Sequence, residues 1–240
     1  MRIGVAILAL VLSTSCGGGL FEQYEYEEEM YLALDGSATV YVNSSMAALD
    51  ALRGATFDTS PNTAVDRNAV RTFFTTPVTR VNGSVQTFRR SNRRFVHVRV
   101  EVNDVRRLRE AGPFAWSSYA LGREDGLVAY RQTVGAAAAK AVTTNWTGRE
   151  FVAFRIHVPS KVEYHNAGAP NLRRGNILVW EQPLPDRLKG TPLVLEAKVQ
   201  TKSILYRTLW LFAGTGLAVA LMFVVVIWLI VRRGAKTAKA

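Results

Sequence analysis

Apolar and polar residues alternate along most of the chain, which is the pattern of half-buried β-strands. The first alternating stretch spans residues 24–34 and turns at Asp35-Gly36, where glycine supplies the positive φ of a tight hairpin. Residues 38–42 return along the same apolar face, and Asn82-Gly83 gives residues 78–88 a second hairpin signal. On the first strand we expect Tyr24, Tyr26, Met30, Leu32 and Leu34 on one face and Glu25, Glu27 and Glu29 on the other.

Further strands are predicted, and helices are fewer and shorter. Ser44 or Ser45 caps a predicted helix over 46–52 that ends at Gly54, and Asn103 caps another over 104–111. Residues 66–74 give a third predicted helix, and residues 135–144 read as helix or loop. The other predicted strands cover residues 94–102, 115–121, 127–133, 151–158, 177–182 and 193–200. The fold class is therefore α+β, mainly antiparallel β-sheet with a few short helices.

The last apolar segment differs from the strands because it has no polar face. Residues 209–231 form a run of twenty-three residues without a charge. As a helix this run is about 34 Å long, which covers a hydrocarbon layer of about 30 Å. Tyr206, Trp210 and Trp228 lie near its ends, where aromatic rings favour the membrane interface. We expect a transmembrane helix over 209–231; the alternative is a buried helix of a soluble core.

Charges flanking this segment predict its orientation. Arg232 and Arg233 follow it at once, and the tail 232–240 contains no acidic residue, so we expect this tail in the cytoplasm. Residues 23–205 are then an exported domain on the outer face of the cytoplasmic membrane. The N-terminus agrees, because Arg2, a ten-residue apolar core and three small residues are typical of a secretory signal peptide over 1–16. Residues 17–22 begin with three glycines and are expected to form a flexible tether.

Cys16 is the single cysteine of the chain, so the exported domain has no internal disulfide. Its place directly after small residues resembles the lipobox of bacterial lipoproteins, whose cysteine carries the lipid anchor. The lipobox usually has leucine three residues before the cysteine, where this chain has Ser13, and Leu12 lies one residue further back. We expect Cys16 to be lipidated; the alternative is ordinary signal-peptidase cleavage nearby.

The net charge of +11 is concentrated in particular segments. Five glutamates cluster at residues 22–29, whereas eleven arginines lie between residues 67 and 109. Three partners suit these arginines: anionic lipid headgroups, an acidic surface of another envelope protein, or the chain's own glutamates; an arginine-rich solvated surface is the plain alternative. Nucleic acid is not expected as a partner, because the domain is exported and no stacking-aromatic module accompanies the cations. The candidate basic patch, centred on the sequence FRRSNRR, consists of Arg80, Arg89, Arg90, Arg93, Arg94 and Arg99.

Candidate catalytic residues are scarce. His97 and His157 fall on the polar faces of their strands, and Glu163 with His165 is a weak metal-binding pattern. No phosphate-binding loop, dinucleotide fingerprint or nucleophile elbow occurs. We therefore expect no catalytic residue, metal or cofactor, and an envelope enzyme assisted by a metal at Glu163 and His165 is the least favoured alternative.

The chain resembles the LppM-type membrane-anchored bacterial proteins in its architecture. The likeness rests on the lipobox-like Cys16, the early LALDGSATVYV hairpin, and a late ILVWEQPL…GTPLVLEAKV region that runs into one spanning helix with a basic tail. This resemblance implies a non-enzymatic envelope protein that binds lipid or glycolipid through its exported domain, with no catalytic residue to transfer. Such binding predicts an apolar cavity or groove beside residues 89–94. A scaffold that recruits other envelope proteins is the alternative function.

Overall fold

The structure is a computed structural model that describes residues 23–138, 141–168 and 175–237. The predicted signal peptide 1–16, the tether 17–22 and Cys16 lie outside the described residues. The strands are β1 (Gln23–Leu32), β2 (Ala38–Ser45), β3 (Thr79–Val81), β4 (Gln86–Arg90), β5 (Arg93–Val102), β6 (Ser117–Glu124), β7 (Leu127–Val134), β8 (Glu150–His157), β9 (Val162–His165), β10 (Ile177–Pro183) and β11 (Leu193–Gln200). The helices are α2 (Met46–Arg53), α3 (Arg67–Phe74), α4 (Leu184–Leu188) and α5 (Ile204–Thr237), with 3₁₀ segments η1 (Val105–Glu110) and η2 (Gly112–Phe114).

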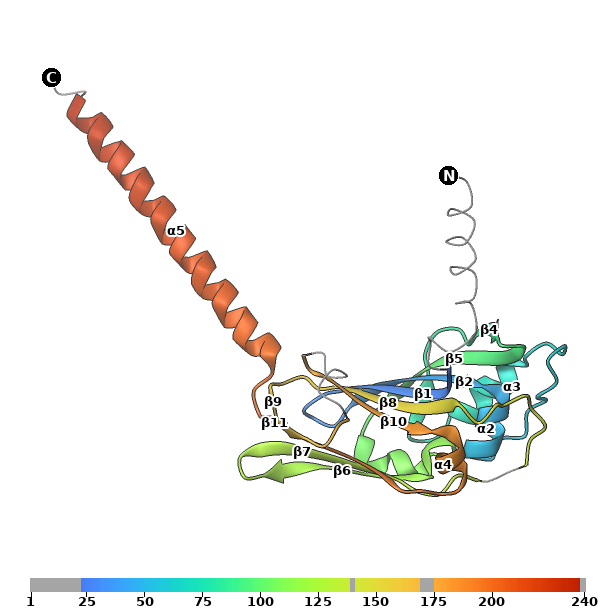
Figure 1. Ribbon diagram of the computed structural model, residues 1–240. Coiled ribbons are helices and arrows are strands. Elements are labelled where there is room, and N and C mark those ends of the chain that lie inside the picture. Colours follow the sequence, from blue (N-terminus) through green and yellow to red (C-terminus); the bar gives the residue numbers. More distant parts are fainter. Residues whose placement is uncertain (1–22, 139–140, 169–174, 238–240) are drawn as a thin grey trace, which may run out of the picture.

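The strands form two sheets. Sheet A has seven strands in the order β10-β8-β1-β2-β5-β3, with β4 also paired to β5, and sheet B has the order β6-β7-β11-β9. All strand pairs in these sheets are antiparallel except β1 with β8. Sheet B lies beneath sheet A, and α2 and α4 gather at the end of the domain away from α5 (Figure 1). The predicted α+β class, dominated by antiparallel sheet, is confirmed.

The core lies between the two sheets and beneath the helices. Val96, Val98, Val100 and Val102 of β5 are buried as their alternation predicts, and His97 is partly exposed on the other face of sheet A. Sheet B contributes buried residues to the same cluster, including Tyr119, Val128, Tyr130, Leu195 and Val199. Sheet A therefore has one covered face and one face open to solvent.

Two helices follow their sequence signals closely. Ser45 caps α2 by accepting a hydrogen bond from the Ala48 amide (3.1 Å), and Gly54 ends the helix with a φ of 69°. Asp66 caps α3 by accepting from the amides of Asn68 and Ala69. The predicted helix over 104–111 is instead the 3₁₀ segment η1, and its cap is Asp104 rather than Asn103. The Asp104 carboxylate accepts from the Arg106 amide at 2.9 Å.

The second predicted hairpin is wrong. β3 and β4 do not pair with each other; both pair with β5, β4 along its first half and β3 along its last residues. Asn82-Gly83 is thus part of a short irregular segment within one edge of sheet A, where the Asn82 amide still donates to the Arg99 carbonyl (2.9 Å). Strand β9 was not predicted from the sequence, and residues 135–138 and 141–144 contain neither helix nor strand.

Strand β1 departs from simple alternation. Its pairing with β8 shifts register between Tyr24 and Tyr26, and this irregularity buries Glu25 completely instead of leaving it on the open face. Glu28 shares the inner face with Tyr26 and Met30 and is only 2% exposed. Two carboxylates of one strand are therefore inside the domain.

A basic side chain from α2 neutralises Glu28. Arg53 Nη2 lies 2.6 Å from Glu28 Oε2 and also donates to the Tyr26 hydroxyl, while its guanidinium lies over the Trp116 ring, 3.6 Å from the centroid. Gln132 of β7 donates to the other Glu28 oxygen at 3.3 Å, which links the two sheets. Burial raises the pKa of Tyr26 well above its usual value, so its hydroxyl stays protonated.

Helix α5 follows sheet B and is the apolar helix expected from the sequence. Its segment Thr208–Leu229 has a mean hydropathy of 2.4 over its most apolar part, and none of that part is buried. Tyr206, Trp210 and Trp228 are all exposed. The helix is long and apolar enough to cross a membrane, and it extends beyond the expected 209–231 at both ends.

Removing the charge of Glu28 should strongly destabilise the domain. In Glu28→Gln the buried Arg53 loses its counter-charge, and we expect the free energy of unfolding to fall by about 3–5 kcal/mol. Urea unfolding followed by tryptophan fluorescence measures this fall, and Arg53→Met added to the same variant should recover part of it. Glu110→Gln is the matched control, because the Arg107–Glu110 pair is exposed and should contribute less than about 1 kcal/mol. Equal losses in Glu28→Gln and Glu110→Gln would contradict the assignment.

Candidate functional site

The sequence FRRSNRR forms the tight hairpin between β4 and β5. Ser91 and Asn92 both have positive φ values, 50° and 57°, as a two-residue turn of the primed type requires. Across this turn Arg90 pairs with Arg93 and Arg89 with Arg94. We call residues 89–94 the arginine turn. The four arginines of this turn enter different surroundings.

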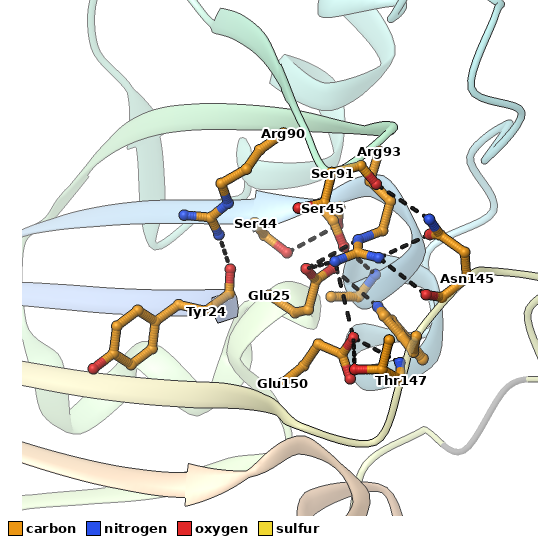
Figure 2. Close-up of polar contacts among 12 residues, drawn as sticks. Tyr24, Glu25, Ser44, Ser45, Arg90, Ser91, Arg93, Asn145, Thr147 and Glu150 are labelled. Carbon is orange, nitrogen blue, oxygen red and sulfur yellow. Dashed lines mark hydrogen bonds and ion pairs between the residues drawn. The ribbon is translucent and has the colours of Figure 1, made fainter. Parts of the chain in front are cut away.

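Arg93 points into the domain and is 7% exposed. Its Nε and Nη2 lie 3.0 and 2.9 Å from Glu25 Oε1, and its Nη1 donates to Asn145 Oδ1 at 2.8 Å (Figure 2). The indole of Trp146 donates to the second Glu25 oxygen at 2.9 Å. Arg93 therefore joins the start of β1 to the loop before β8, and its charge is used within the protein.

Glu150, at the start of β8, completes this cluster from below (Figure 2). Its carboxylate lies 3.9 Å from Arg93 Nη2 and accepts hydrogen bonds from the amides of Thr147 and Gly148. Burial raises the pKa of Glu150, but these backbone hydrogen bonds outweigh burial and lower its pKa overall, so the carboxylate is charged at neutral pH.

Arg94 and Arg90 are also engaged inside the domain. Arg94, 5% exposed, donates to the Thr63 carbonyl at 2.8 Å and to the Asp58 carbonyl, and so holds the loop 58–63 against the sheet. The Arg90 guanidinium lies over the Phe95 ring, 4.5 Å from the centroid, and donates to the Tyr24 carbonyl. Three of the four arginines of the turn are thus structural.

The six arginines predicted as one patch do not form a common surface. Arg80 and Arg99 share a single partner near the other end of β5, Glu101, at 3.0 and 3.9 Å. Arg89 is exposed, and it has no ion pair within the described part of the chain. Three partners were considered for these arginines from the sequence. Arg93 binds one of them, the chain's own glutamates.

A groove of about 770 Å³ lies directly beside the arginine turn. Its walls are the loop before α3, the first turn of α3 and strand β4. Phe88, 40% exposed, and Val65 supply apolar surface. Arg67 and Arg89 supply the accessible positive charge, and Arg67 donates to the Thr87 hydroxyl at 3.2 Å. A groove is therefore present beside residues 89–94, but its lining is mixed and not mainly apolar as predicted from the sequence.

The elements α3 and β4, which wall the groove, lie at the end of the domain away from α5 (Figure 1). The start of β1 contacts the arginine turn, since Tyr24 and Glu25 bind Arg90 and Arg93. The connector to α5 lies beyond the end of β8, where the Ser203 hydroxyl donates to the Pro159 carbonyl at 3.3 Å. Because β1 and β8 run parallel over ten and eight residues, the two regions are separated by about 30 Å.

The other candidate residues Glu163 and His157 contact neighbouring side chains. Glu163 accepts from Lys161 Nζ at 3.2 Å and from Gln200 Nε2 at 2.6 Å. Within the described ranges no group of three metal-ligating side chains surrounds it or His165. His157 lies on the open face of sheet A, 2.5 Å from Glu29 and stacked on the exposed Tyr31 ring at 3.9 Å.

The described chain is thus a two-sheet α+β domain with one apolar C-terminal helix and an arginine-lined groove at the far end. No family model matches the chain, and no curated protein matches it. Among solved structures it is similar to the folded domain of LppM from Mycobacterium tuberculosis, determined by NMR. The two share 12% sequence identity over 77% of this chain and 94% of the other, with a TM-score of 0.38. This likeness is a distant structural one and assigns a role to no residue.

The loop that walls the groove should depend on the ionised form of Asp58. Hydrogen bonds from Ser60 and Thr63, together with the charge of Arg94, lower the pKa of Asp58 to about 2. Because an unfolded aspartate titrates near about 3.9, its contribution is complete above about pH 4 and is lost as the pH falls through about 2. Carboxyl carbon shifts of Asp58 in an NMR titration measure this pKa. A midpoint near 4, or a loop unchanged in Asp58→Asn, would contradict the contact.

Proposed function

We propose that this chain is a non-enzymatic protein of the bacterial cell envelope that binds a lipid or glycolipid in the groove beside the arginine turn. The observation that carries the proposal is the groove itself, whose 770 Å³ fall within the range of about 300–1,000 Å³ of small-molecule sites. It combines exposed apolar surface with two accessible guanidinium groups, which suits an amphiphile.

Two kinds of groove residue contact two different parts of the proposed ligand. Phe88 is stacked on the buried Phe95 ring at 5.2 Å, which holds it in place to contact an acyl chain or another apolar group. Arg67 and Arg89 are placed to bind a phosphate or carboxylate, for which planar guanidinium groups are well suited. Arg94 lines the groove but is bound to the loop 58–63, so it supports the wall more than it meets the ligand.

The proposed location follows from α5. The helix spans the cytoplasmic membrane with the sheet domain outside, Tyr206, Trp210 and Trp228 at the interfaces, and the tail with Arg232 and Arg233 in the cytoplasm. A lipid on Cys16 adds a second anchor. The seven residues from Cys16 to Gln23 reach up to about 25 Å, so this anchor leaves room for the groove end of the domain to stand away from the bilayer.

Recruitment of another envelope protein is the second candidate, and the open face of sheet A favours it. Tyr31, Tyr41, His97 and His157 form an aromatic row across four strands, with Tyr31 45% exposed. Crosslinked partners whose capture depends on Tyr31 and is unaffected by Arg89→Glu would favour this candidate over lipid binding.

Lipid binding should depend on the two groove arginines. We expect the soluble 20–202 fragment to bind a monomeric anionic lysophospholipid, and Arg67→Gln with Arg89→Gln to weaken this binding at least tenfold, because a charge-assisted hydrogen bond contributes about 1.5–3 kcal/mol. Isothermal titration calorimetry measures the affinity. The matched control is Arg149→Gln, an exposed arginine that does not line the groove. Binding that does not saturate would reject the groove as the site. Equal affinities of the Arg67→Gln, Arg89→Gln double variant and of the Arg149→Gln control would also reject it.

A further inference from the structure

A second, smaller pocket lies at the opposite end of the domain, where α5 begins. It has a volume of about 260 Å³ and opens between the turn after β1, the hairpin of β6 and β7, and the connector to α5. We call it the base pocket. Its lining includes Leu34, Asp35, Arg106, Leu121, Arg123 and Thr201.

The connector places the base pocket close to the membrane that α5 is proposed to span. Thr201 precedes the apolar segment that starts at Thr208 by seven residues. Three of these steps precede α5 and four lie within it, so even at full extension of the first three they cover at most about 16 Å. The headgroup layer itself is about 5–8 Å thick on each side of the bilayer. The base pocket therefore lies within reach of lipid headgroups. The short connector does not hold the groove close to the bilayer in the same way.

The base pocket offers charges of both signs. Arg106 uses its Nε to bind both oxygens of Asp104, at 2.8 and 3.0 Å, which leaves its terminal nitrogens available. Arg123 is exposed and has no ion pair to any other described residue. Asp35 accepts from Ser37 through one carboxylate oxygen, and these hydrogen bonds lower its pKa, so it is negatively charged at neutral pH. Leu34 and Leu121 give the pocket apolar walls.

Two guanidinium groups beside one carboxylate, whose second oxygen accepts no hydrogen bond from Ser37, match a zwitterion better than a simple anion. A phosphate binds favourably between guanidinium groups, and a primary ammonium donates up to three hydrogen bonds to a carboxylate. A quaternary ammonium has no N–H donor for Asp35, and a glycerol headgroup has no positive charge. With 260 Å³ the pocket has room for a headgroup but is smaller than sites for whole lipid-sized ligands, so the acyl chains remain in the bilayer.

We propose that the base pocket receives the headgroup of a phospholipid of the chain's own bilayer, with the phosphate between Arg106 and Arg123 and a primary ammonium at Asp35. This inference rests on the proposed span of α5 and is independent of the ligand of the groove. The contact fixes how the sheet domain stands on the membrane, because it is made beside the short connector that leads to α5.

Lipid selection by the full chain tests the proposal. The protein is inserted into nanodiscs of phosphatidylethanolamine, phosphatidylcholine and phosphatidylglycerol in equal parts, extracted in mild detergent, and its retained lipids are counted by mass spectrometry. We expect phosphatidylethanolamine to be enriched at least fivefold over phosphatidylcholine. Arg106→Gln with Arg123→Gln should abolish lipid retention at this site, and Asp35→Asn should remove only the preference for the ethanolamine headgroup. Arg149→Gln should behave as the unchanged chain.

Several results would overturn the proposal. These are a lipid composition equal to that of the nanodisc, an enrichment unchanged in both base-pocket variants, or displacement of the lipid by equimolar soluble phosphoethanolamine, which would make the pocket a small-molecule site. Protease protection of the tail in the same nanodiscs reports α5 insertion separately. If α5 is inserted and no enrichment occurs, the base-pocket proposal fails while the membrane span stands. Arg67→Gln with Arg89→Gln separates the groove, because it should leave this enrichment unchanged.

Discussion

The structure depends on how one central strand accommodates four glutamates. β1 is paired on both sides, so its carboxylates lie either between the sheets or on the open face of sheet A, and the buried ones need a positive partner because an unpaired buried charge is costly. The partners come from a helix, a hairpin and the neighbouring strand, which ties these elements to the centre of the sheet. The pairs are Glu28 with Arg53, Glu25 with Arg93, Glu27 with Arg155 and Glu29 with His157.

This requirement determines what remains available for binding. The arginine turn has an excess of positive charge in the sequence, but Arg93 is used by Glu25 and Arg94 by the loop 58–63. The accessible positive charge comes from Arg89 and from Arg67 of α3. These two residues are not close to each other in the sequence. The groove is therefore a by-product of structural pairing. β1 and the loop bind Arg93 and Arg94, and the remaining arginines line the groove together with Phe88.

Local patterns predicted the helices and strands well. They could not predict which strands pair with each other when these strands lie far apart in the sequence. Alternation placed β5 and β11, and the capping serine and Gly54 placed α2, because these signals lie within each segment. Asn82-Gly83 misled because a turn signal does not say which strand is the partner, and here β5 outcompetes β4 for β3. The burial of Glu25 depends on a register shift against β8, more than a hundred residues away. The groove and the base pocket likewise join segments that are distant in the sequence. The sequence therefore showed the individual arginines but not which of them line a common site.

The two ends of the domain therefore have different electrostatic characters. At the end of β1 that meets the arginine turn, accessible arginines stand beside an exposed aromatic ring, which suits an amphiphile with one negative group. At the end that leads into α5, Arg106 and Arg123 are balanced by Asp104 and Asp35, which suits a nearly neutral headgroup layer. In the proposed orientation the base pocket faces the bilayer and the groove lies about 30 Å from that pocket, well beyond a Debye length of about 8–10 Å, so anionic headgroups of this bilayer attract the groove arginines little. The proposed function requires this separation, because one small domain is proposed both to be bound to a membrane and to select a ligand.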